Sequence, residues 1–242
     1  YRSVLEILEN LCANNSNRIF VKGSAGTGKT ILATYIIKLL YSDVSSSNFE
    51  EYNDDELREI GYIKAFQTKY PKAKIGLVIA MTSLRESLKN VFRKIPGLNP
   101  SMVINPSETF KVKEKYDLLI VDEAHRLRQY RNISWMGAFK KNNRKLGLDD
   151  SGTELDWIMA NSKNQIFFYD AAQSVKPSDI DGFRFDEMLN DPYTPKIQLT
   201  SQMRVKGGNN YIQFVDELLN VKRAETAPYF ADNYELLIFD SL

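Results

Sequence analysis

A glycine-rich segment carries the clearest chemical signal in the sequence. It reads Gly23-Ser24-Ala25-Gly26-Thr27-Gly28-Lys29-Thr30, the G-x-x-x-x-G-K-[ST] spacing of loops that bind nucleoside triphosphates. Glycines permit positive φ angles and close backbone approach, so N–H groups can converge on a phosphate. We expect Lys29 to reach the β- and γ-phosphates and the Thr30 hydroxyl to bind Mg²⁺. The predicted ligands are therefore ATP and Mg²⁺; a plain turn between strand and helix is the alternative.

Two neighbouring acids follow an apolar run later in the chain. Tyr116–Val121 is almost continuously apolar, as in strands buried on both faces, and Asp122 and Glu123 come directly after it. A carboxylate is needed opposite a phosphate loop to hold Mg²⁺, and we expect Asp122 to do this. Glu123 is then placed to orient or deprotonate the attacking water. A helix cap or a solvated surface pair is the alternative interpretation.

The segment after the acid pair is basic and aromatic. His125, the single histidine of the chain, is expected to couple the nucleotide to other elements rather than to transfer protons. The cluster that follows could stack against and neutralise a nucleic-acid strand. Its members are Arg126, Arg128, Tyr130, Arg131 and Trp135. A charged surface helix is the alternative, and the sequence alone slightly favours it.

These groups can meet only if the strands that carry them end side by side. Helical and extended patterns alternate along the chain, which predicts an α/β fold with a mostly parallel sheet and helices on both faces. The expected strands are Arg18–Lys22, Ile75–Ala80, Met102–Ile104, Tyr116–Val121, Gln165–Tyr169, Lys196–Thr200 and Tyr234–Phe239. The expected helices are Val4–Leu11, one from Thr30 onward, Glu56–Tyr70, Arg85–Lys94, Ile133–Lys145, Glu154–Met159 and Tyr211–Leu219. Residues 42 to 56 are polar and predict a loop.

Composition limits the alternatives. The chain has 242 residues, is 43% hydrophobic and carries a net charge of +1, so it can fill a large core, and any polyanion site must be local. The single cysteine, Cys12, excludes a disulfide framework and favours a cytoplasmic location. The apolar run Ile31–Tyr41 is too short to cross a bilayer and predicts a buried helix. Tyr1 is not a start residue, so the lack of a signal peptide carries little weight.

Five stretches, in this order, resemble the superfamily 1 helicases, and specifically the Schlafen-type helicase-like family. They are VKGSAGTGKT at 21–30, IGLVIAMTSLRESLKNVF at 75–92, YDLLIVDEAHRLR at 116–128, FFYDAAQSVKPSDI at 167–180 and LTSQMRVKGGNNYIQF at 199–214. The resemblance implies a RecA-like P-loop NTPase fold. It also implies that the chain acts on single-stranded DNA or RNA, without deciding between them.

The same resemblance implies roles for residues outside the phosphate loop. Asp170 and Gln173 fill the third motif, in which the glutamine senses the γ-phosphate and links it to the nucleic-acid side. Arg204 is the arginine that contacts the γ-phosphate, and Thr82 and Ser83 lie where such proteins touch the backbone of a single strand. Without the resemblance, Asp170 and Gln173 read as turn and cap residues, and Arg204 as part of a solvated basic turn.

The sequence departs from the family pattern at two places. Tyr169 stands where the third motif has a glycine, and the first glutamine of the chain is Gln67, so no glutamine precedes the phosphate loop to recognise adenine. By the resemblance, residues 1–230 form the first RecA-like motor domain, with insertions at about 42–72 and 129–164. Residues 231–242 would lead into a second RecA-like domain, which would complete the site.

These observations predict an ATPase motor domain of a helicase-like protein, with Lys29, Thr30 and Asp122 holding Mg²⁺-ATP and Glu123 activating water. An ATP-gated module that binds nucleic acid or protein without translocation is the alternative. A P-loop kinase fits less well, because a kinase must exclude water and has no use for a water-positioning acid. No membrane partner is expected, and the oligomeric state is not predicted.

Overall fold

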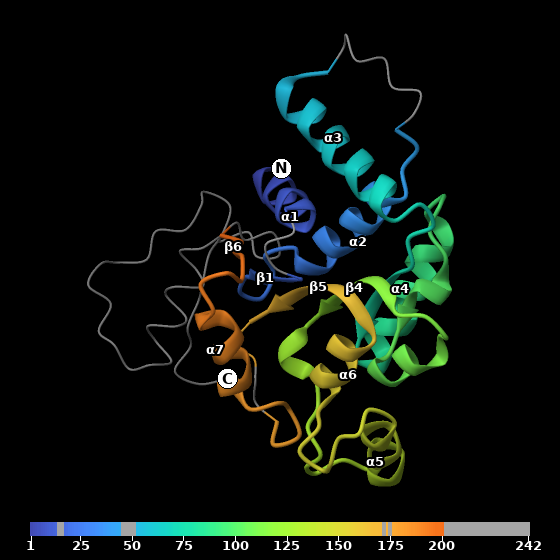
Figure 1. Ribbon diagram of the computed structural model, residues 1–242, viewed down its shortest axis with the longest axis vertical. Helices are drawn as coiled ribbons and strands as arrows, with labels where there is room; N and C mark the ends of the chain where they lie inside the picture. Colours follow the sequence, from blue (N-terminus) through green and yellow to red (C-terminus); the bar gives the residue numbers. More distant parts are fainter. Residues whose placement is uncertain (14–16, 45–51, 171–172, 174–175, 201–242) are drawn as a thin grey trace, which may run out of the picture.

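A parallel β-sheet lies at the centre of the chain, between two layers of helices (Figure 1). The computed structural model describes residues 1–13, 17–44, 52–170, 173 and 176–200. Within these residues the sheet has six strands in the order β3-β2-β4-β5-β1-β6, and every neighbouring pair is parallel. The strands are β1 (Arg18–Lys22), β2 (Ile75–Ile79), β3 (Val103–Ile104), β4 (Tyr116–Asp122), β5 (Ser162–Tyr169) and β6 (Lys196–Gln198). The predicted α/β fold is confirmed.

The register of the sheet brings the carboxyl ends of four strands to one edge. Lys22 at the end of β1 lies opposite Tyr169 at the end of β5. Ile79 at the end of β2 lies opposite Asp122 at the end of β4. β5 also pairs with β4, so it lies between β1 and β4. The segments that follow these strands therefore begin next to one another, at the edge where open α/β sheets bind their ligands.

Alternate residues of each strand pack against different helix layers. In β1, Ile19 and Val21 belong to one core cluster and Phe20 to the other. The first layer consists of α1 (Arg2–Cys12), α2 (Lys29–Leu40), α3 (Asp54–Lys69) and α4 (Thr82–Lys94). The second contains α6 (Glu154–Ala160) and α7 (Gly182–Asn190), with α5 (Met136–Lys145) farther from the sheet (Figure 1). Short 3₁₀ helices are η2 (Pro100–Met102), η3 (Pro106–Lys111) and η4 (Ala124–Arg126).

The start of β5 differs from the sequence-based expectation. The strand begins at Ser162, not at Gln165, because its polar residues find partners inside the fold. The Ser162 hydroxyl donates to the Ile158 carbonyl at 2.6 Å, and the Asn164 amide donates to the Asp117 carbonyl at 2.8 Å. Such hydrogen bonds make the burial of polar side chains tolerable. These polar residues precede the apolar run from which the strand is predicted, so the prediction begins too late in the sequence.

Two helices begin three residues away from the position that the sequence indicates, and a third is buried on one face only. α4 begins at Thr82 rather than Arg85, and α5 at Met136 rather than Ile133. α2, predicted as a buried helix, packs one face into the core, whereas Ile31 on its other face is 70% exposed. The expected helix Tyr211–Leu219 and strand Tyr234–Phe239 lie outside the described residues.

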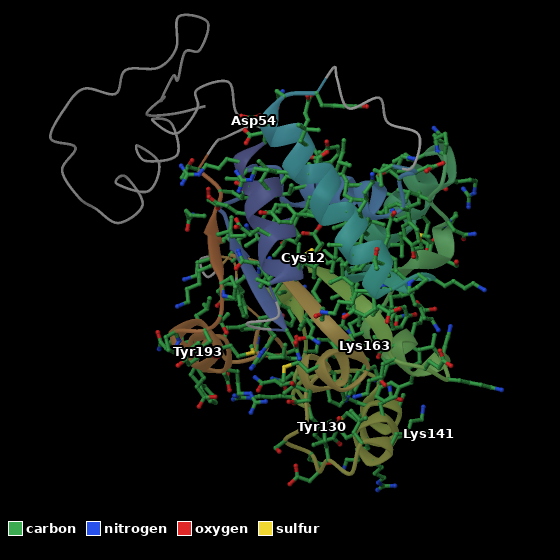
Figure 2. The ribbon with its side chains drawn as sticks, turned by 45° about the horizontal axis from the view of Figure 1, so that its top comes forward. Cys12, Asp54, Tyr130, Lys141, Lys163 and Tyr193 are labelled. Atoms are coloured by element: carbon green, nitrogen blue, oxygen red, sulfur yellow. The ribbon has the colours of Figure 1, made fainter. Side chains whose placement is uncertain are left out.

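The half-buried thiol of Cys12 lies where α1 meets α3 and donates to the Tyr62 carbonyl at 3.5 Å (Figure 2). Of the helices in the described ranges, none combines the length and the apolar character that a membrane span requires.

Glu154 is a buried acid in the first turn of α6. Its side chain is 8% exposed, and Oε2 accepts a hydrogen bond from the Arg128 backbone N–H at 2.9 Å. Its own backbone N–H donates to the Arg128 carbonyl at 3.0 Å. Burial disfavours the charged form and raises the pKa of Glu154 to about 7.

We expect Glu154→Gln to change how stability depends on pH. The folded-state pKa lies above the unfolded value, so folding favours the protonated acid. This contribution is complete below about pH 4.5 and is lost as the pH rises towards 7. Glutamine does not titrate, so the variant should gain on the order of 2–3 kcal/mol relative to wild type between pH 4.5 and 8. Urea unfolding at both pH values measures this, with the exposed Glu114→Gln as control. Parallel pH profiles for wild type and Glu154→Gln would contradict the expectation.

Candidate functional site

The glycine-rich loop between β1 and α2 is a tight turn around a buried centre. Gly26 and Gly28 both have φ of 83°, a conformation that glycine adopts without strain, and Gly28 caps α2. A Cβ atom at Gly23 would lie 2.5 Å from Thr27 Oγ1. That hydroxyl already donates to the Ser24 carbonyl at 2.9 Å. The loop therefore needs glycine at Gly23 for space and at the other two positions for backbone conformation.

The Lys29 side chain turns into the loop from the start of α2. It is 5% exposed, and its Nζ donates to the carbonyls of Gly23 at 2.6 Å and Ser24 at 2.9 Å. The same Nζ lies 3.8 Å from the Asp170 carboxylate, which is also buried. A buried positive charge thus lies at a helix amino terminus, where the helix dipole adds to its attraction for anions.

Thr30 and Asp122 are in direct contact across the sheet edge. The Thr30 hydroxyl donates to Asp122 Oδ2 at 2.5 Å, and Asp122 Oδ1 accepts from the Glu123 N–H at 3.0 Å. Asp122 is 1% exposed, and burial raises its pKa. Mg²⁺ is usually bound through one or two carboxylates together with substrate phosphates and water. The pair fits such an ion, and the part of the chain that the structure describes has no cluster of three or more His, Cys, Asp or Glu side chains that could hold a metal alone.

Glu123 has an unusual backbone conformation directly after β4. Its φ is 53°, in the left-handed region, which costs a non-glycine residue about 1–2 kcal/mol. Its Oε2 lies 2.9 Å from Nε2 of the fully buried His125, although the N–H does not point straight at the oxygen. The contact with His125, opposed by burial and supported by the Lys29 charge, lowers the pKa of Glu123. The carboxylate is therefore held ionised at the end of the strand.

His125 joins the ends of β4 and β5. Its Nδ1 accepts a long hydrogen bond, 3.4 Å, from the Asp170 backbone N–H, which assigns the ring proton to Nε2, the atom that faces Glu123. The ring packs edge-on against Tyr169, with 6.3 Å between centroids. The sequence suggested a coupling role for His125, but no local signal indicates that its partner is the Asp170 backbone.

Tyr169 explains one departure from the family pattern. It is 4% exposed, and its ring packs 4.7 Å from Phe185 of α7 and 6.4 Å from Phe20 of β1. Its carbonyl accepts from the Gly23 N–H at 3.3 Å. The tyrosine therefore fills the core under α7, and its backbone stays in the position that connects β5 to the phosphate loop.

Gln173 completes the group on the β5 side. Its amide Nε2 donates to Asp170 Oδ2, and its backbone N–H donates to the Asp170 carbonyl at 3.2 Å. A cavity of about 290 Å³ lies between these elements. It is lined by Ala25, Gly26, Gly28, Lys29, Thr30, Ile31, Glu123 and Gln173. A larger hollow, about 1030 Å³, lies along the start of β2 and β4, but none of the predicted site residues lines it. The smaller cavity is therefore identified as the candidate site by the residues that line it and not by its volume.

The remaining predicted residues lie elsewhere. Thr82 and Ser83 are exposed in the first turn of α4, after β2, and do not line the cavity. Thr82 Oγ1 accepts from the Arg85 guanidinium at 3.2 Å. Arg204 lies outside the described residues, so its role stays a prediction.

The basic and aromatic cluster is not a surface helix, contrary to the alternative that the sequence slightly favoured. Between η4 and α5 the chain is irregular, and Arg128 forms an antiparallel bridge with Asp179. Arg126 makes an ion pair with Asp179 at 3.5 Å, and Tyr130 packs against Phe139 with 5.8 Å between centroids. The cluster is therefore divided between residues with internal contacts and residues that face solvent.

A parallel sheet with a phosphate loop after β1 and an acid pair at the carboxyl end of β4, with β5 between these strands, is the arrangement of the RecA-like class of P-loop NTPases. The sequence matches the family described as Schlafen group 3, DNA/RNA helicase domain, over residues 16–242, and the chain belongs to that family. A search of curated proteins found no match.

Three of the solved structures that are similar to the chain are of Pif1 proteins. Bacteroides sp Pif1 in complex with ADP-AlF4 is 14% identical, with a TM-score of 0.40, over 93% of this chain and 47% of that one. A structure of two coordinating Pif1 helicases at forked dsDNA is 15% identical, with a TM-score of 0.40, over 93% and 49%. Bacteroides Pif1 bound to ssDNA is 12% identical, with a TM-score of 0.40, over 90% and 46%. The chain spans about half the length of these proteins.

Two glycine substitutions should have opposite effects on stability. Gly23→Ala places a methyl group against Thr27 Oγ1 and Leu199 Cβ, so it should lower the free energy of unfolding by about 1–3 kcal/mol. Gly61→Ala, on the exposed side of α3 with no atom within 4 Å of the new Cβ, should raise it by about 0.5–1 kcal/mol. Urea unfolding measures both. A neutral Gly23→Ala would show that the loop is not packed as described.

Proposed function

We propose that the chain is the first motor domain of a superfamily 1 helicase-like protein, which binds Mg²⁺-ATP and hydrolyses it in response to single-stranded nucleic acid. The hydrogen bond between Thr30 and Asp122 is the observation that carries the proposal, because it joins the phosphate loop to the acidic strand end. Family membership supports the assignment to a helicase-type domain. Translocation and unwinding would require the longer protein.

The chemistry proposed is transfer of the γ-phosphoryl group to water. Lys29 neutralises charge on the β- and γ-phosphates, and Mg²⁺ held by Thr30 and Asp122 would balance the remaining charge. Glu123 orients the water and accepts its proton; its lowered pKa keeps it in the basic form. Because positioning and electrostatics supply most of the acceleration in such reactions, a small rigid cavity suits this task.

The response to nucleic acid is proposed to run through β5. The γ-phosphate would face Gln173, which is bound to Asp170, whose backbone contacts His125. A change at Gln173 would thus reach Glu123 through three contacts, by way of Asp170 and His125. From the family resemblance, Arg204 would approach the γ-phosphate, and the second RecA-like domain would close over the nucleotide.

Substitution of Lys29 and Glu123 should separate binding from hydrolysis. Lys29→Ala should abolish nucleotide binding, because a buried cation is removed from the loop. Glu123→Gln should keep binding and lower turnover by about 10²- to 10⁴-fold. Fluorescent-nucleotide binding and steady-state ATP turnover measure the two effects, and Lys38→Ala, in the last turn of α2 and outside the cavity lining, is the matched control.

The two results together decide between the functions. Normal turnover in Glu123→Gln would refute the role assigned to this residue. Tight ATP binding by wild type without turnover, in this chain and in a protein that carries both RecA-like domains, would favour the ATP-gated binding module instead.

Gln173→Ala should affect coupling more than nucleotide binding. Its side chain lines the cavity but carries no charge, so ATP affinity should change less than about tenfold. Stimulation of turnover by a single-stranded oligonucleotide should be largely lost, because the contact between the γ-phosphate side and Asp170 is removed. Turnover with and without oligonucleotide measures this. Undiminished stimulation would exclude Gln173 as the sensor.

A further inference from the structure

Two hollows meet at Trp135, beside the candidate nucleotide site but separate from it. Their volumes are about 440 Å³ and 290 Å³. Four residues line both hollows, and we call them the tryptophan shelf: Ala80, Arg128, Ile133 and Trp135. The shelf begins directly after β2, whose last residue pairs with Asp122. It therefore lies at the ligand-binding edge of the sheet, on the other side of β4 from the phosphate loop.

Trp135 is unusual for its exposure. Its side chain is 73% exposed, whereas the other tryptophan, Trp157, is 2% exposed and packs 4.4 Å from Phe139. Among the described residues no aromatic ring pairs with Trp135. Met81 and Met136 nearby are also exposed, at 44% and 46%. Grouped exposed apolar side chains on a folded domain mark a surface that binds something.

The charges around the shelf favour an anionic partner. Arg128 and Lys176 line the hollows, and within the described ranges neither side chain has a carboxylate at ion-pair distance. The lining acids are already engaged: Asp179 lies 3.5 Å from the Arg126 guanidinium, and Glu154 accepts from the Arg128 backbone. The chain as a whole carries only +1. A partner that carries both phosphates and planar rings would therefore complement this positive surface and the exposed aromatic ring beside it.

The backbone at Arg128, one member of the shelf, is held from two directions. The Gln129 N–H donates to the Ser178 carbonyl at 3.0 Å, and the Ile180 N–H donates to the Leu127 carbonyl at 2.9 Å. These bonds flank the bridge between Arg128 and Asp179. On its other side, the Arg128 backbone exchanges two hydrogen bonds with Glu154. Binding a strand at Arg128 would therefore cost little ordering of this backbone segment.

We infer that Trp135 stacks against an unpaired base of a single-stranded nucleic acid, while Arg128 and Lys176 neutralise the adjacent phosphates. The inference deepens the proposed function and rests on its nucleic-acid part. The 440 Å³ hollow lies within the size range of small-ligand sites and can accept one base. Every base can stack on an aromatic side chain, so the site would recognise unpaired bases whatever their sequence. Thr82, predicted to contact the strand, lines the same hollow.

Tryptophan fluorescence tests the stacking directly, because the chain has two tryptophans and Trp157 is buried. Oligo(dT) and oligo(U) of equal length should quench the emission of wild type, and comparing the two separates DNA from RNA preference. Trp135→Phe should lose the quenching but keep most of the affinity, since phenylalanine also stacks. Quenching that persists in Trp135→Phe would overturn the inference.

Affinity measured by anisotropy of labelled oligonucleotides gives the second readout. Trp135→Ala should weaken binding about 5- to 100-fold, and Arg128→Ala should weaken it more at low salt than at high salt. The matched control is Tyr193→Ala, because Tyr193 is 75% exposed but lies beside α7, far from α5 (Figure 2); it should bind like wild type. Thermal unfolding of each variant checks that it is folded.

An oligonucleotide with abasic sites separates base stacking from backbone binding. Wild type should bind it more weakly than the intact strand, and Trp135→Ala should bind both equally. If Trp135→Ala binds the intact strand as wild type does and the strand still stimulates ATP turnover, the inference fails while the proposed function stands. If wild type binds neither strand but hydrolyses ATP, the inference and the nucleic-acid part of the proposed function fail together.

Discussion

The contact between the Thr30 hydroxyl and the Asp122 carboxylate is the interaction on which the arrangement of the chain depends. It joins residues 92 positions apart at 2.5 Å, and it exists only because β1 and β4 end at the same edge of one parallel sheet. Asp122 is almost fully buried, and a buried carboxylate is costly unless hydrogen bonds and nearby cations compensate it. The hydroxyl, the Glu123 N–H and the Lys29 charge provide that compensation.

β5 lies between β1 and β4, and the residues at its carboxyl end connect the phosphate loop to the segment that follows β4. Tyr169 connects to the loop through Gly23, and Asp170 connects to Lys29 on one side and to His125 on the other. The carboxyl end of the central strand thus contacts, on both sides, groups that the proposed reaction uses. The left-handed backbone of Glu123 is a local strain that these surrounding contacts must stabilise.

Much of the fold and the centre of the site could be predicted from the sequence, because their signals are local. The phosphate loop is a contiguous pattern, and buried parallel strands are apolar runs that end in acids. The start of β5 was missed because its buried polar residues hydrogen-bond inside the fold, Ser162 to Ile158 in the preceding helix and Asn164 to Asp117 in the neighbouring strand. The irregular course of residues 127–135 was missed for the same reason, since its determinant is pairing with Asp179. The role of Arg204 and the domain boundaries remain predictions.

Two strands, β4 and β5, lie between the tryptophan shelf, which begins after β2, and the phosphate loop, which follows β1. If both sites bind, their affinities are linked by thermodynamic reciprocity: the factor by which a bound strand changes ATP affinity equals the factor by which ATP changes affinity for the strand. Hydrolysis would then change the affinity for the strand by the ratio of the factor for ATP to the factor for the products. This reciprocity sets a condition on any cycle of binding and release that the protein performs.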